Sequence, residues 1–182
     1  MTTEFIRTLY LAGPGVFRAD AVAWGARLQA ACQAHGWQGL YPLDNAISAA
    51  SKAEQAQQIF AGNCALIHAA DAVLADVRAF RSGSEPDSGT AFEIGYAHAL
   101  GKPVWLWLPA ALAGQDMRSR IGAATDADGL QVEDFGAPLN LMLWQAAAGV
   151  VYADEPESAL LELDKVSRET SGSLQSAASL LK

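Results

Sequence analysis

The chain has 182 residues, 51% of them hydrophobic, which suits one globular domain with a sizeable core. Its formal net charge of -8 argues against a nucleic-acid partner or an anionic membrane surface, because phosphates are held by Lys and Arg. The first residues lack the basic start of a signal peptide, and no apolar run reaches the roughly 18 residues of a membrane span, so we expect a cytoplasmic protein.

Strand and helix signals alternate from the start of the chain. Thr8 to Ala12 is a short apolar run that ends in a Gly-Pro-Gly turn, which indicates a strand. Asp20 can cap a helix that ends at Gly36, and residues 39–42 form a second strand. The spacing of Ser51 and Glu54 predicts a capping box, which opens a helix with an inner stripe of Ile59, Phe60, Asn63, Leu66 and Ile67.

The second half continues the pattern. Residues 72–76 form the third strand, residues 88–100 a helix that is apolar on nearly every side, and residues 103–108 a fourth strand suited to a sheet centre. A long connection, 109–136, precedes an apolar segment (139–148) and a last strand (149–153). Glu155 to Arg168 forms a closing helix; residues 1–170 make one domain, and the Ser- and Ala-rich residues 171–182 a flexible tail.

This alternation predicts an α/β fold. We expect a single-domain, doubly wound (Rossmann/flavodoxin-like) protein with a five-stranded, mostly parallel sheet and helices on both faces.

Glu93 is the only carboxylate within the apolar helix 88–100. Positions one turn away offer no Lys or Arg to pair with it, and burying an unpaired charge is costly. A Glu that simply points to solvent would be the plainest explanation. We favour a reactive carboxylate held in a cleft, because chains rarely keep an unpaired carboxylate in an apolar helix without a use.

Other polar residues stand where predicted strands end, which is where open α/β sheets bind ligands. Tyr10 and Gly13 close the first strand, Asp44 follows the second, Asp76 ends the third, and Asp87 precedes the helix of Glu93. Turn chemistry explains Asp44 and Asp76 equally well, and Asp87 has the position of a helix cap. Asn63 lies within an apolar stripe, where its amide needs a hydrogen-bond partner; a backbone group is the simpler one.

Several kinds of site are disfavoured. The turn after the first strand lacks GxGxxG spacing, Pro14 removes an amide donor, and no P-loop ending follows, so we expect no nucleotide cofactor. Cys32, Cys64 and the three His lack metal-ligand spacing, and we expect no metal and two reduced thiols.

Three motifs resemble the nucleoside 2-deoxyribosyltransferase family. Tyr10-Leu11-Ala12-Gly13-Pro14 with Val16-Phe17 is similar to the family's opening motif, and Pro86 to Ala97 is similar to its nucleophile motif. Pro138-Leu139-Asn140-Leu141-Met142 resembles the segment that family members donate to the neighbouring subunit's active site. The loop from Asp76 to Asp87 is similar to the family's specificity loop.

The resemblance implies transfer of 2-deoxyribose between nucleobases. Glu93 would attack the anomeric carbon, expel the base and form a covalent deoxyribosyl-enzyme, which a second base then resolves with net retention. Tyr10 would orient Glu93, and Asp87 would relay protons to the base. Substrate-binding residues would be Gly13, Phe17, Asn63, Asp76, Asn140 and Met142, although Asn63 replaces an Asp found in part of the family.

The same resemblance implies deoxynucleosides and free bases as ligands, a role in nucleoside salvage, and a homo-oligomer of at least two chains, since Asn140 and Met142 would serve a neighbour. Two alternatives stay open. Water in place of a second base would make the protein an N-glycoside hydrolase acting on nucleosides or their 5'-monophosphates. A site without turnover would make it a nucleoside- or nucleotide-sensing module.

Overall fold

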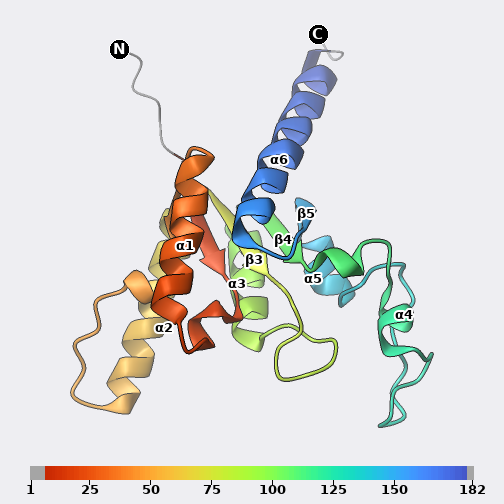
Figure 1. Ribbon diagram of the computed structural model, residues 1–182, viewed down its shortest axis with the longest axis horizontal. Helices are drawn as coiled ribbons and strands as arrows, with labels where there is room; N and C mark the ends of the chain where they lie inside the picture. The colour runs from red at the N-terminus through yellow and green to blue at the C-terminus, as the bar shows by residue number, and fades with distance from the viewer. Residues whose placement is uncertain (1–6, 180–182) are drawn as a thin grey trace.

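The computed structural model describes the backbone of residues 7–179 and the side chains of residues 7–167. One all-parallel sheet has the strand order β2-β1-β3-β4-β5, the order of flavodoxin-like sheets, which confirms the predicted fold class (Figure 1). The strands are β1 (Arg7–Ala12), β2 (Trp37–Leu40), β3 (Ala72–Asp76), β4 (Val104–Leu108) and β5 (Gly149–Tyr152).

Helices cover both faces of the sheet. The α-helices are α1 (Ala21–Ala34), α2 (Lys52–Ala69), α3 (Ser88–Ala99), α4 (Met117–Ile121), α5 (Leu141–Gln145) and α6 (Pro156–Ser179). Three short 3-10 helices are η1 (Pro14–Phe17), η2 (Pro42–Asp44) and η3 (Ala110–Leu112). The helices α1 and α6 pack on one face, and α2, α3 and α5 pack on the other.

Alternate residues of a strand pack in two separate hydrophobic cores, one on each face of the sheet. In β1, Leu9 and Leu11 join the α1–α6 core, whereas Tyr10 and Ala12 join the core beneath α2 and α3. Successive side chains of a strand point to opposite faces, so this period of two follows from the strand geometry. It places Tyr10 on the same face of the sheet as α3.

Side-chain caps start several helices. Ser51 Oγ accepts the amide of Glu54 at 3.2 Å, as predicted, while the Glu54 carboxylate reaches back to the amide of Ala50 at 2.8 Å. Asp20 occupies the N-cap position of α1 but makes no capping hydrogen bond, because its carboxylate binds the Arg18 guanidinium. The prediction is therefore right about the position of Asp20 but wrong about its capping hydrogen bond.

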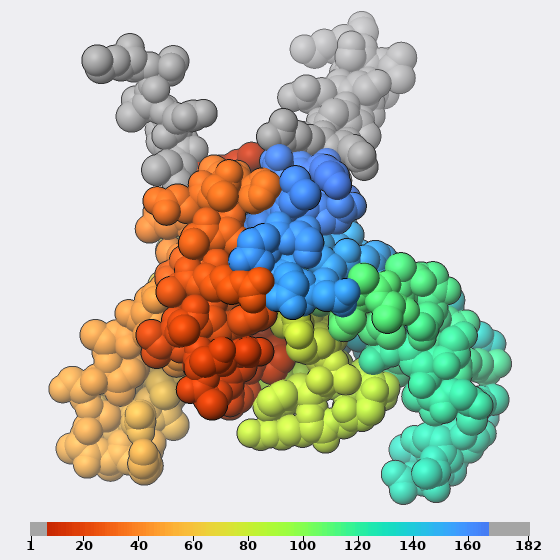
Figure 2. All heavy atoms as spheres, viewed as in Figure 1, coloured from red at the N-terminus to blue at the C-terminus, as the bar shows by residue number. Residues whose placement is uncertain are grey.

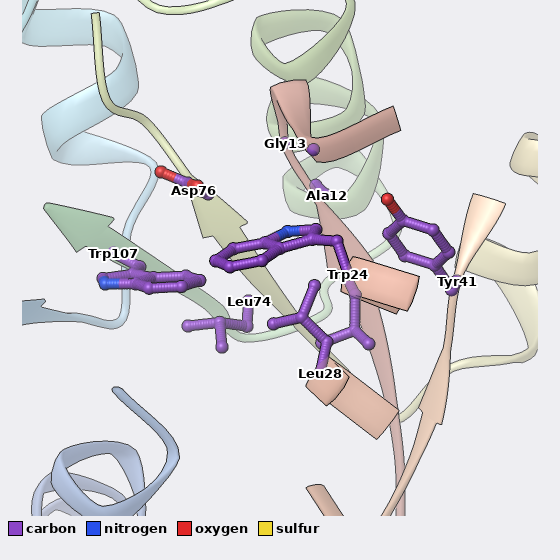
Figure 3. Close-up of a pocket in the computed structure, with 10 residues that line it drawn as sticks. Ala12, Gly13, Trp24, Leu28, Tyr41, Leu74, Asp76 and Trp107 are labelled. Atoms are coloured by element: carbon purple, nitrogen blue, oxygen red, sulfur yellow. The ribbon is translucent and has the colours of Figure 1, made fainter. Parts of the chain in front are cut away.

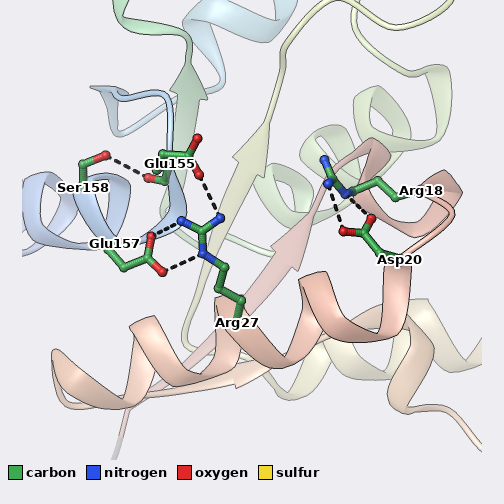
Figure 4. A network of polar contacts seen from close by, with 6 residues as sticks. All are labelled: Arg18, Asp20, Arg27, Glu155, Glu157 and Ser158. Atoms are coloured by element: carbon green, nitrogen blue, oxygen red, sulfur yellow. Dashed lines mark hydrogen bonds and ion pairs between the residues drawn. The ribbon is translucent and has the colours of Figure 1, made fainter.

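An exposed cluster joins the two helices of the first face. The Arg27 guanidinium, on α1, binds Glu155 at 2.8 Å and Glu157 at 2.6 Å at the start of α6 (Figure 4). Exposed pairs of this kind contribute roughly 0–1 kcal/mol each. Their main effect is to orient the beginning of α6 against α1.

Some predicted boundaries and faces are wrong. The strand expected at residues 39–42 runs from Trp37 to Leu40, because Pro42 begins η2. Two residues of the supposed inner stripe of α2, Ile59 and Phe60, are 41% and 58% exposed, and α3 also leaves Phe92 50% exposed. These helices bury only part of their apolar surface within the chain.

The end of the chain differs as well. The closing helix expected to stop at Arg168 continues to Ser179, so the tail expected over 171–182 is helical up to that residue. Residues 180–182 lie outside the described part of the chain. The flexibility of this tail and the domain boundary at 170 stay predictions. No helix among the described residues is long and apolar enough to cross a membrane.

Candidate active site

A cavity of about 490 Å³ opens at the carboxyl end of β1, between the first loop and the helices α2 and α3. Its size falls within the roughly 300–1,000 Å³ usual for small-molecule sites. The lining residues come from four segments and are mostly apolar: Gly13, Val16, Phe17, Pro42, Leu43, Asn45, Ile47, Gln55, Ile59, Asn63, Asp87, Gly89 and Glu93. Glu93 and Asp87 are its two carboxylates.

Glu93 lies half-buried at this cavity and accepts a hydrogen bond from Tyr10. The Tyr10 hydroxyl is 2.6 Å from Oε1 of Glu93, within the range of a short charge-assisted bond. The Tyr10 ring is fully buried in the core beneath α3, so its hydroxyl is held in place. The structure therefore contains the contact through which, by the family resemblance, Tyr10 would orient Glu93.

Burial raises the pKa of Glu93 to about 7, even though the hydrogen bond from Tyr10 lowers it, and the nearby Asp87 raises it further. Burial, together with the negative charge of Glu93, also raises the pKa of the Tyr10 phenol above its ordinary value. The phenol therefore keeps its proton and serves as a donor. A carboxylate with a pKa near neutrality, in a cleft, is typical of functional sites.

Asp87 is both the cap of α3 and a wall of the cavity. Its Oδ2 accepts the Thr90 amide at 3.0 Å and the Thr90 hydroxyl at 3.3 Å. Both hydrogen bonds to the Asp87 carboxylate among the described residues fall on Oδ2, so Oδ1 has no partner among them, and Asp87 lines the cavity. The predicted cap is confirmed, and it still leaves room for a second role.

Gly13 and Phe17 bring the first loop against the cavity. Gly13 has a φ of 144°, and a Cβ there would lie 2.7 Å from the Cβ of Asp76, so only glycine fits. Phe17 is 56% exposed and stacks on Phe80 with ring centroids 5.0 Å apart. The Arg81 guanidinium lies over both rings. Loop 77–87, between β3 and α3, thus backs the aromatic wall of the site.

Asn63 reaches the cavity, as expected, but its partner is a side chain. Its Oδ1 accepts from Nδ2 of Asn45 at 3.0 Å, and the same Nδ2 group also donates to the carbonyl of Pro42. The sequence analysis did not single out Asn45. The nearest signal was Asp44, whose carboxylate instead binds the backbone of Tyr41 and the side chain of Gln29.

Asp76 lies apart from the Glu93 cavity. Arg78 Nε binds its two carboxylate oxygens at 2.8 and 2.7 Å, and Asp76 is 5% exposed. It borders a separate hollow with Trp24, Arg78 and Phe80, as well as a void of about 10 Å³ (Figure 3). That void, lined by Gly13 and Trp24 among others, is about as small as a cavity that can take a water molecule. The structure therefore places Asp76 against Gly13, but it does not bring Asp76 into the lining of the cavity that holds Glu93 and Asp87.

Asn140 and Met142 are also remote from the cavity of their own chain. Asn140 caps α5 through Oδ1, which accepts the Met142 amide at 3.0 Å, and its Nδ2 donates to Glu133 at 2.6 Å. Met142 is 72% exposed. Both follow the segment 110–137, green to teal in Figure 2, which projects from the body of the molecule. The sequence analysis did not single out Glu133.

Comparisons with known proteins show which family the chain is similar to. Residues 9–142 match the family model described as nucleoside 2-deoxyribosyltransferase. The solved structure of a 2-desoxiribosyltransferase from Leishmania mexicana is 37% identical, covers 87% of this chain and 97% of its own, and superposes with a TM-score of 0.68.

Two further relatives are more limited. A 2-deoxyribosyltransferase structure from Bacillus psychrosaccharolyticus shares the fold at 20% identity and a TM-score of 0.52, over 82% of this chain and 87% of its own. An uncharacterised protein of Schizosaccharomyces pombe is 34% identical over 99 residues, which are 53% of this chain. The match spans 47% of that curated relative, about half of its length.

Proposed function

This chain belongs to the nucleoside 2-deoxyribosyltransferase family, and from that premise we propose that it moves 2-deoxyribose from a deoxynucleoside to a free nucleobase. The observation that carries the proposal is the pair of Glu93 and Tyr10. A carboxylate faces a cavity of nucleoside-site size and is oriented by a buried phenol at 2.6 Å. Oriented carboxylates are the nucleophiles of retaining glycosyl transfer.

In the first displacement, one carboxylate oxygen of Glu93 bonds to the anomeric carbon of the nucleoside. The bond from that carbon to the base nitrogen breaks, and its electron pair leaves with the base. Asp87, at the same cavity, supplies a proton to the base as it departs. During this step Tyr10 keeps its hydrogen bond to the Glu93 carboxylate. The hydrogen bond holds the attacking group in one orientation.

In the second displacement, a nitrogen of the incoming base attacks the same carbon and releases Glu93 as a carboxylate. Asp87 takes up the proton that the incoming base loses. Two inversions at one carbon give net retention. The enzyme returns to its starting protonation state, and no cofactor is consumed.

Residues at the cavity wall would hold the two halves of the substrate. Phe17 offers a ring for stacking, and the amides of Asn63 and Asn45 offer hydrogen-bonding groups to a base. Asp76 would join them only after releasing Arg78. Gly13 lets the first loop approach the sugar closely.

The proposed active assembly is a homo-oligomer in which Asn140 and Met142 complete a neighbour's site. Two features support it. Neither residue lines the cavity of its own chain, and Met142 is 72% exposed. The helices α2 and α3 also expose a cluster of touching aromatic rings beside the cavity, formed by Phe60, Phe92 and Tyr96, and apolar surface of this kind is typical of subunit interfaces.

The test is base exchange by the purified protein. Deoxyinosine or thymidine is incubated with adenine, and the formation of deoxyadenosine is followed by chromatography. We expect transfer by the native protein and none by Glu93→Ala with the fold retained by circular dichroism. Undiminished transfer by Glu93→Ala contradicts the proposal.

The same reaction without adenine separates the alternatives. Base release at an unchanged rate identifies a hydrolase, in which water completes the reaction. Binding without any turnover identifies a sensing module. Mass spectrometry of the protein mixed with deoxyinosine alone tests the intermediate, which should add one deoxyribosyl group to the peptide that contains Glu93.

A further inference from the structure

Arg120, on the short helix α4, bridges two segments that are distant in the sequence. Its Nη2 group donates to the carbonyl of Ser84 at 2.8 Å, and its Nη1 group donates to the carbonyl of Pro138. Arg120 is half-buried, and in the described part of the chain it forms no salt bridge. Apart from a 3.8 Å contact of Nη1 with Sδ of Met117 on the same helix, the hydrogen bonds of its guanidinium among the described residues go to these two backbone carbonyls.

Each of these carbonyls stands close to a candidate site residue. Ser84 lies in loop 77–87, three positions before Asp87. Pro138 lies two positions before Asn140. One side chain thus connects the backbone that leads to the proposed acid with the backbone that leads to the residue offered to a neighbour.

The fork of an arginine suits this connection. Its N–H groups diverge in a rigid plane, so one guanidinium can hold two separated acceptors in a fixed relation, whereas a lysine ammonium is a compact charge on a flexible stem without such a fork. Both connected segments are held at other points too. Phe80 N donates to the carbonyl of Glu85 within loop 77–87, and Glu133 binds the Asn140 side chain. Arg120 is the contact that spans the two.

We propose that Arg120 is a positioning residue that couples the loop of Asp87 to the segment of Asn140. The inference rests on the proposed function for the roles of those two residues. In an oligomer, Asp87 would serve the chain's own site and Asn140 a neighbour's. The guanidinium would then link the base side of one site to the sugar side of another.

The first experiment reads the link without any activity. Hydrogen exchange is measured on the full-length protein for Arg120→Met and for the control Arg118→Met. Arg118 lies on the same helix and pairs with Asp134 on the surface at 2.7 Å. We expect faster exchange in both 79–87 and 138–142 for Arg120→Met, and in neither for the control. Unchanged exchange, or a change in only one segment, overturns the proposal.

The second experiment is kinetic. Arg120→Met should lower kcat/KM for deoxyinosine about tenfold or more, with the midpoint of the pH profile unchanged, because Arg120 does not touch Glu93 or Tyr10. Arg120→Lys keeps the charge but lacks the rigid fork, so its kcat/KM should fall between those of the native protein and of Arg120→Met. Arg118→Met should match the native protein.

Coupling between the two segments also predicts non-additivity. The double variant of Arg120→Met and Asn140→Ser should lose less activity than the product of the two single losses. Fully multiplicative losses, or a loss explained by the fraction of unfolded protein, overturn the proposal. A native protein without transferase activity would refute the proposed function, and the hydrogen-exchange result would still decide whether Arg120 links the segments.

Discussion

The hydroxyl of Tyr10 donates a 2.6 Å hydrogen bond to Oε1 of Glu93, although the two residues are 83 positions apart in the chain. One comes from the buried strand β1 and the other from the helix that follows β3. Because both elements are anchored in the same core, the donor cannot follow the carboxylate if that carboxylate moves. Five predictions concern this pair and the residues around it.

Replacing Tyr10 by Phe should slow transfer strongly while preserving the fold. The variant keeps the buried ring but loses a hydrogen bond to a charged group, which contributes about 1.5–3 kcal/mol and corresponds to a rate loss of about 10- to 100-fold. Steady-state kinetics with deoxyinosine and adenine check this. An unaltered kcat would mean that the phenol does not orient the nucleophile.

Transfer should depend on pH through the ionisation of Glu93. Its pKa is raised to about 7, chiefly by burial, and only the charged form attacks. We therefore expect kcat/KM to rise with pH, with the midpoint of this rise at about 7. In Tyr10→Phe the midpoint should move higher, since the hydrogen bond that lowers the pKa is gone. A midpoint near 4.5 in the native protein contradicts the assignment.

Glu93→Gln should stabilise the protein at high pH. The pKa of Glu93 is raised from 4.5 to about 7, so the folded state binds its proton more tightly than the unfolded state. The contribution of the protonated Glu93 to the free energy of unfolding is complete below about pH 4.5 and is lost as the pH rises through about 7. The shift corresponds to about 3 kcal/mol.

Urea unfolding at two pH values checks this. The advantage of Glu93→Gln over the native protein should be large at pH 8 and small at pH 5. Glu162→Gln, which changes an exposed carboxylate paired with Lys165, serves as the control and should have little effect at either pH. An advantage of Glu93→Gln that does not grow with pH would argue against a buried, destabilising charge.

Asp87→Asn and Asp87→Ala should separate the two roles of Asp87. Asn is a good N-cap but cannot transfer a proton, so this variant should stay stable and lose about 100-fold or more in kcat. Asp87→Ala should lose in addition about 1 kcal/mol of stability through the missing cap. If Asp87→Asn transfers deoxyribose at the native rate, the carboxylate is a cap alone.

Mixing two inactive variants should restore activity if the site is shared. When the Glu93→Ala and Asn140→Ser proteins are mixed and exchange subunits, about half of the dimers contain one chain of each kind. Each mixed dimer has one intact site of two, so about a quarter of the native number of sites is restored. Ser keeps the cap of α5. Activity assays before and after exchange provide the comparison. Confirmed exchange without recovery would place each complete site within one chain.

Much of this architecture could be predicted from the sequence because its determinants are local. Alternating apolar runs, the Ser51 cap and the Gly-Pro-Gly turn each act over a few residues. The contact between Tyr10 and Glu93 is expected from the family resemblance of their two motifs, and it forms because the parallel sheet brings β1 next to the helix after β3.

Other features depend on tertiary detail that no local pattern carries. Asn45 enters the cavity because the chain after η2 folds against α2 at Gly62, where any side chain would clash with it. Asp76 faces away because Arg78 turns back onto it from two positions along the chain. Helical periodicity assigned Ile59 and Phe60 to the inner stripe of α2. It could not distinguish an apolar face that packs on the sheet from one that stays exposed.

The alternation of side chains along β1 separates the molecule into two cores, one on each face of the sheet. Glu93, Tyr10, Asp87 and Asn63 all belong to the side covered by α2 and α3, while the side covered by α1 and α6 contributes packing and the surface pairs of Arg27. Protein engineers could therefore raise thermal stability by redesigning the outer surface of α1 and α6. The proposed substrate site, which lies on the other side, would be left untouched.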